Sequence, residues 1–105
     1  PAYPPDAGLL KTLITASVER SYRPDGIARQ MHAVMTDGER ANLLHRITAP
    51  TLVIHGKADP LVPYACGEDM ARRIPGARLL GIEGMGHDLP PAVVARLLEA
   101  LVPFY

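Results

Sequence analysis

The sequence has little that would support a disulfide, a metal site or a highly charged partner. Its single cysteine, Cys66, excludes an internal disulfide and a cysteine cluster for zinc. Eleven basic and eleven acidic residues leave a formal net charge of zero, so we expect neither a nucleic-acid partner nor an anionic membrane surface. No apolar run approaches the roughly 20 residues that span a bilayer, and no signal peptide is recognised. We therefore expect a cytoplasmic protein with no metal and no cofactor.

The composition is otherwise that of one small globular domain, with 48% hydrophobic and 21% charged residues in a chain of 105. The sequence opens in a proline-rich stretch, residues 1–5, which has the character of a loop interior. This opening predicts that the chain is a fragment of a longer protein.

The first fifty residues have the three-to-four residue apolar spacing of amphipathic helices. Asp6 is a good N-cap for a helix over about residues 6–20, and a turn at 23–26 begins a second helix that ends at Asp37. A third, shorter helix is predicted over about residues 39–47, with Leu43 and Leu44 inward. The apolar stripes of the first two helices comprise Leu9, Leu10, Leu13, Ile14, Val18, Ile27, Met31, Val34 and Met35.

From Pro50 onward the pattern changes to alternating strands and helices, which indicates βαβ winding. The apolar, β-branched run 51–55 predicts a buried parallel strand, and residues 77–82 predict a second, weaker one. Helices are expected at 64–74, as the crossover, and at 91–101. The predicted fold class is α/β, with two parallel strands in a βαβα unit preceded by three helices. We place the domain boundary between residues 47 and 48.

Asp59 follows the first strand and His87, in Gly84-Met85-Gly86-His87, follows the second. Because parallel strands bring their carboxyl ends to one edge of the sheet, the two side chains are expected to meet there. A carboxylate that binds one imidazole nitrogen fixes the tautomer and leaves the other nitrogen as a general base. The sequence therefore predicts the acid and histidine of a catalytic triad.

The residues around this pair resemble the α/β-hydrolase family. Thr48 to Gly56 with Asp59-Pro60 and Val62-Pro63 is similar to that family's acid segment, and Ile74 to Ala77 leading to Gly84 to His87 is similar to its histidine segment. The ending Gly-Met-Gly-His-Asp-Leu-Pro is similar to esterase-like members such as the anthracycline methylesterases. The resemblance implies that residues 1–47 are the end of a helical cap and 48–105 the carboxyl-terminal part of the core.

By the same resemblance, Asp59 and His87 are the predicted catalytic residues, and Met31 and Met35 would line the substrate pocket if their helix belongs to a cap. The nucleophile elbow G-x-S-x-G and the oxyanion-hole loop of the family do not occur in this sequence. Ser17 and Ser21 lie in the first helix region without flanking glycines, so neither is expected to be a nucleophile.

Other polar residues near the pair have a weaker claim to a catalytic role. Glu83 is a weak alternative acid, and Asp88 is too close in sequence to His87 to orient it easily. His55, at the end of the first strand, is interpreted as a packed or hydrogen-bonded structural residue. His45 is expected on the surface.

Three functions remain open at this point. The first is the carboxyl-terminal part of a serine hydrolase for small-molecule esters, and the second is part of an epoxide hydrolase or haloalkane dehalogenase with an aspartate nucleophile. The third is a truncated βαβ module without catalysis that self-associates. Because two strands make a marginal sheet with an open edge, we expect a homo-oligomer with residues 51–55 or the first helix in the contact.

Overall fold

The computed structural model describes residues 2–104 and divides them into two compact units. Residues 2–4 and 40–104 form the first unit, and Pro5–Glu39 form the second. Both strands of the described chain, and the residues that follow them, belong to the first unit.

The second unit contains two helices, α1 (Ala7–Arg20) and α2 (Pro24–Thr36). Asp6 caps α1 as predicted, because its side-chain oxygen accepts a hydrogen bond of 2.8 Å from the backbone N–H of Leu9. None of the described residues in either helix is buried, and the apolar stripes expected there are 43–79% exposed.

Among residues 2–104, no helix combines the length and the apolar character required to cross a bilayer.

The first unit is built around two parallel strands, with Val53 opposite Leu79 and His55 opposite Gly81. This pairing confirms the predicted α/β class and the crossover between the strands. In chain order the elements of the unit are η1 (Ala41–Arg46), β1 (Leu52–Gly56), α3 (Tyr64–Arg73), β2 (Arg78–Ile82), α4 (Pro91–Leu101) and η2 (Val102–Phe104).

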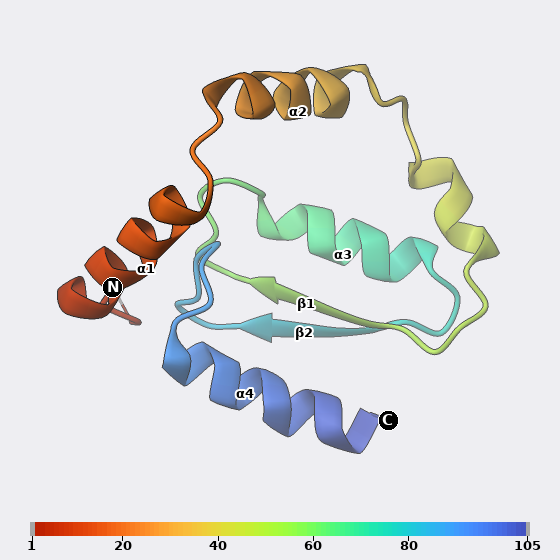
Figure 1. Ribbon diagram of the computed structural model, residues 1–105. Coiled ribbons are helices and arrows are strands. Elements are labelled where there is room, and N and C mark those ends of the chain that lie inside the picture. The colour runs from red at the N-terminus through yellow and green to blue at the C-terminus, as the bar shows by residue number, and fades with distance from the viewer. Residues whose placement is uncertain (1, 105) are drawn as a thin grey trace. The chain divides into compact units, whose positions relative to one another are not determined.

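The two strands lie between α3 and α4 (Figure 1). Successive strand residues point to opposite faces of a sheet, so each helix covers the side chains of every second strand residue. Gly67 of α3 lies against His55 on one face, whereas Val93 of α4 packs in the core on the opposite face. The core cluster consists of Ile82, Met85 and Val93, with Tyr3, Ile54, Leu80 and Leu97 packed against it.

The third predicted helix is a short 3-10 helix, η1, which groups with the strands rather than with α1 and α2. Residues three apart share a face in a 3-10 helix, and Ala41, Leu44 and Ile47 are accordingly partly covered. Leu43 lies on another face and is exposed, so the expectation that it points inward was wrong. The division between residues 47 and 48 into cap and core stays a prediction.

Candidate active site

Asp59 and His87 are joined by a hydrogen bond at the edge where both strands end. The Nδ1 atom of His87 lies 2.9 Å from Oδ2 of Asp59, although the residues are 28 positions apart. Asp59 stands three residues beyond the last residue of β1, and His87 five beyond the last residue of β2. The parallel pairing therefore brings the two loops together as the sequence predicts.

The carboxylate of Asp59 is held by its own loop. Its Oδ1 atom accepts hydrogen bonds from the backbone N–H groups of Leu61, at 2.8 Å, and Val62, at 3.0 Å. Pro60, the residue after Asp59, has no N–H that could compete for this oxygen. The side chain of Asp59 is only 6% exposed. One oxygen is thus occupied by the loop and the other binds the imidazole.

These bonds favour the charged form of Asp59. The hydrogen bond from the Val62 backbone, with smaller contributions from the His87 side chain and the Leu61 backbone, lowers the pKa of Asp59 from 3.8 to about 2, although burial opposes the shift. Asp59 is therefore a carboxylate at neutral pH, and a carboxylate can only accept a hydrogen bond. The proton in the contact must belong to Nδ1 of His87, which leaves Nε2 of the neutral ring unprotonated and basic.

The loop that contains His87 is fixed against the end of β1. The carbonyl of Met85 accepts a hydrogen bond of 2.9 Å from the N–H of Ala58, and the Met85 side chain is buried in the core cluster. Gly84 turns the chain with φ 71°, a conformation that glycine adopts readily. The His87 side chain remains 52% exposed, so its ring is accessible while its loop is anchored.

Two further polar side chains, those of Glu83 and His55, lie in the segments that lead to the pair. Glu83 forms an ion pair of 3.1 Å with Lys57 on the surface, so the structure does not favour it as the acid. His55 is packed and hydrogen-bonded, as interpreted, and it lies near the pair: its Nε2 atom is 2.9 Å from the carbonyl oxygen of Val62 and 3.7 Å from Oδ2 of Asp59. The available signal was a histidine at the end of an apolar strand, four residues before the acid.

Comparison with known proteins identifies the family. The sequence profile described as TAP-like protein matches residues 25–96, which is more than half of the chain. The chain belongs to the TAP-like protein family. Its parallel strands and its structural relative show the α/β-hydrolase fold, and its relatives show a resemblance to esterase-like members of that fold.

Relatives of this TAP-like chain include hydrolases of two descriptions. Over 58 residues, or 55% of the chain, it is 47% identical to rhodomycin D methylesterase DnrP of Streptomyces peucetius and covers 20% of that protein. Over 63 residues, or 60% of the chain, it is 40% identical to the putative carbamate hydrolase RutD of Pseudomonas savastanoi pv. phaseolicola and covers 24% of it. The chain thus spans about a fifth to a quarter of the length of these curated relatives.

A solved structure resembles the TAP-like chain over a longer stretch. The esterase EaEST from Exiguobacterium antarcticum superposes with a TM-score of 0.58 and 25% identity, covering 80% of this chain and 37% of its own. The similarity supports the assignment of the two strands and their helices to the α/β-hydrolase fold.

The methionines predicted as substrate contacts lie in the second unit. Met31 and Met35 are both on α2, and both are exposed. Their contact with a substrate stays a prediction. Ser17 is inside α1, and its backbone carbonyl accepts a hydrogen bond from the N–H of Ser21. Ordinary helix-terminal geometry of this kind is not the sharp turn of a nucleophile elbow.

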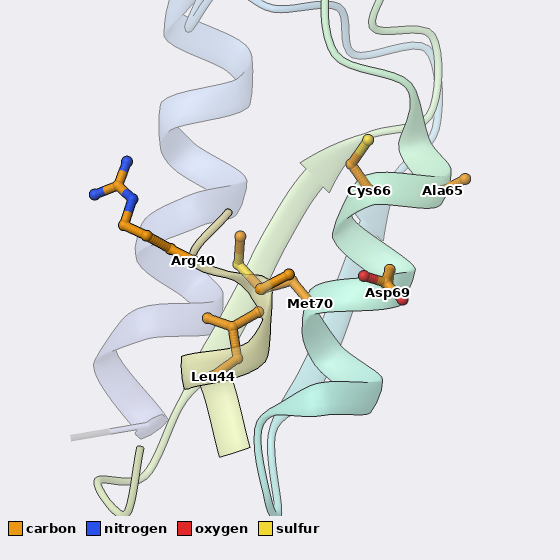
Figure 2. A pocket seen from close by; sticks show the side chains of 7 residues that line it. Arg40, Leu44, Ala65, Cys66, Asp69 and Met70 are labelled. Carbon is orange, nitrogen blue, oxygen red and sulfur yellow. The ribbon is translucent and has the colours of Figure 1, made fainter. Parts of the chain in front are cut away.

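A separate hollow in the TAP-like chain lies between η1 and α3 (Figure 2). Neither Asp59 nor His87 lines it. Asp69 at its margin is bound by Arg73 at 2.6 Å and by Arg72, and the Arg73 side chain lowers the pKa of Asp69. The residues that line the hollow are Arg40, Ala41, Leu44, Ala65, Cys66, Asp69 and Met70.

Among residues 2–104, no three His, Cys, Asp or Glu side chains are grouped as a metal site requires.

Proposed function

We propose that this chain supplies the acid and the histidine of a serine hydrolase that acts on small-molecule esters. The observation that supports this most directly is the 2.9 Å contact between the charged, nearly buried Asp59 and the accessible ring of His87. Such a pair orients an imidazole and stabilises its protonated form. An ion pair made only for stability would not need an exposed histidine ring.

In this proposal Nε2 of His87 is the general base. It takes the proton of a serine hydroxyl as the oxygen attacks the ester carbonyl, and Asp59 stabilises the imidazolium that forms. The imidazolium then gives the proton to the leaving alcohol, and a second cycle with water releases the acid. The serine and the donors to the oxyanion come from residues outside the present sequence.

Acyl chemistry is favoured over attack on an epoxide or a haloalkane. The relatives include a methylesterase, a putative carbamate hydrolase and an esterase. Ester cleavage and carbamate cleavage both begin with attack on a carbonyl carbon. The residues of this chain serve either nucleophile equally, so the relatives alone support the choice of serine.

We also propose that the isolated chain self-associates. The observation that favours this is the exposure of every apolar residue in the stripes of α1 and α2. Exposed apolar patches of this kind usually mark contact surfaces.

The catalytic proposal can be tested in the natural gene product that contains these residues. With p-nitrophenyl acetate as substrate, His87→Ala is expected to lower kcat by about 10³-fold or more, since a triad without its base keeps little activity. His45→Ala is the matched control, because His45 is an exposed histidine on η1 and should leave the rate unchanged. Equal rates for the wild type and the His87 variant would contradict the proposal.

A further inference from the structure

We propose that His55 is a positioning residue for the Asp59–His87 pair, acting through the backbone of Val62. The inference rests on the proposed function for its consequence in catalysis, but the contacts that support it are independent of any reaction. His55 is the last residue but one of β1, four positions before Asp59.

The first contact is the hydrogen bond of 2.9 Å between Nε2 of His55 and the carbonyl oxygen of Val62. A carbonyl can only accept, so Nε2 carries the proton and donates it. The Oδ2 atom of Asp59 is 3.7 Å from the same nitrogen, which is too far for a hydrogen bond. His55 therefore influences Asp59 through the loop and not by direct contact.

Val62 connects the two side chains through the two polar groups of its backbone. Its carbonyl accepts from His55, and its N–H donates to Oδ1 of Asp59 at 3.0 Å. The flanking Pro60 and Pro63 have no N–H with which to fasten the loop. Holding the Val62 backbone thus holds one of the two donors that fix the Asp59 carboxylate for His87.

The ring of His55 is itself tightly confined, as an anchor must be. A Cβ atom on Gly67 of α3 would lie 2.7 Å from Nδ1 of His55, so the helix can approach only because residue 67 has no side chain. The ring of Tyr64 meets the imidazole edge to face, with centroids 5.7 Å apart and an interplanar angle of 84°. The His55 side chain is 13% exposed. A fixed ring holds the Val62 carbonyl in one place.

Two substitutions separate the hydrogen bond from the packing. His55→Phe keeps an aromatic ring against Tyr64 but removes the donor, whereas His55→Gln keeps an N–H donor at a similar reach. The readout is the ¹⁵N spectrum of the His87 ring, which distinguishes the Nδ1–H and Nε2–H tautomers, together with the exchange rate of the Nδ1 proton. Thermal unfolding shows in parallel that each variant is folded.

We expect wild type and His55→Gln to hold His87 as the Nδ1–H tautomer. In His55→Phe the tautomers should mix and the Nδ1 proton should exchange about tenfold faster, the order expected for losing one hydrogen bond. If the phenylalanine variant does not fold, His55→Leu takes its place as the variant without a donor. A single Nδ1–H tautomer with unchanged exchange in the folded donor-free variant would overturn the inference. Loss of the single tautomer in the donor-free variant and in His55→Gln alike would also overturn it.

A kinetic comparison then separates this inference from the proposed function. In the natural gene product, His55→Phe should lower kcat with little change in KM, and His55→Gln should restore it. If the wild type hydrolyses no ester but the tautomer of His87 still follows the donor at position 55, the proposed function fails and the positioning role of His55 stands.

Discussion

The carbonyl oxygen of Met85 lies so close to Gly56 that a Cβ atom on residue 56 would collide with it. The carbonyl of Gly86 would be 2.5 Å from the same Cβ. Gly56 ends β1, and Met85 and Gly86 immediately precede His87. The loop of the histidine is therefore seated directly on the end of the strand that leads to Asp59.

From this contact we predict that Gly56→Ala destabilises the chain and separates Asp59 from His87. Both obstructing atoms belong to the backbone and cannot rotate away, so the loop must move, at a cost of about 1–3 kcal/mol. Denaturant unfolding should show the loss of stability, and the ¹⁵N spectrum of His87 should show loss of the single tautomer. Gly38→Ala is the matched control, since a Cβ there meets nothing within 4 Å. The prediction would be contradicted if Gly56→Ala had the stability of the wild type and kept the single tautomer of His87.

Much of this arrangement follows from the sequence, because the apolar runs and their turn residues determine two parallel strands and the order of their loops. Asp59 and His87 each lie in the loop that follows a strand, so the topology brings them to the same edge of the sheet. The sequence indicated a packed or hydrogen-bonded His55 but not its partner, because the bond to Val62 depends on how the intervening loop folds back.

Periodicity also identified the apolar stripes of α1 and α2 but not their environment. A stripe shows which face of a helix requires burial and not what covers it, and every residue of these stripes is exposed in the described chain. The 3-10 geometry of η1 likewise depends on its short span and its contact with α3, so Leu43 was placed on the wrong side.

The lowered pKa of Asp59 predicts a specific loss of stability in acid. Because the pKa is about 2 in the folded chain and about 3.8 as an ordinary aspartate, the contribution is complete above about pH 4 and is lost as the pH falls to about 2. Urea unfolding between pH 5 and pH 2 should therefore show a fall in stability that is smaller in Asp59→Asn. Asp69→Asn is the control: it removes another carboxyl group whose pKa is lowered and should leave the contribution of Asp59 in place. Identical pH dependences for wild type and Asp59→Asn would contradict the assignment.

We predict that the 105-residue chain alone does not hydrolyse activated esters beyond the rate of free imidazole. A general base without a nucleophile and oxyanion donors lacks most of the catalytic power of a triad enzyme. Release of p-nitrophenol from p-nitrophenyl acetate is a sufficient assay, with imidazole at equal concentration as the reference. Turnover well above that reference that disappears in His87→Ala would reveal a nucleophile among residues that we have excluded, with Ser17 and Ser21 the first to test.

The last prediction concerns self-association through α1. Leu13 and Ile14 lie in its exposed apolar stripe, and each 100 Å² of such surface removed from water contributes about 2.5 kcal/mol. Burial of several hundred Å² would therefore contribute several kcal/mol, which is comparable with the roughly 5–15 kcal/mol by which small domains are stable, so a dimer or larger assembly is expected at micromolar concentration.

Leu13→Lys should shift this assembly toward monomer in sedimentation velocity, because a charge placed in an apolar contact must be desolvated. Thr15→Lys adds the same charge to α1 but lies about 200° around the helix, on its polar side, so it should leave the assembly intact. A folded wild-type monomer would refute self-association. Equal dissociation by both variants would show that charge on the unit matters and that the stripe of α1 is not the contact.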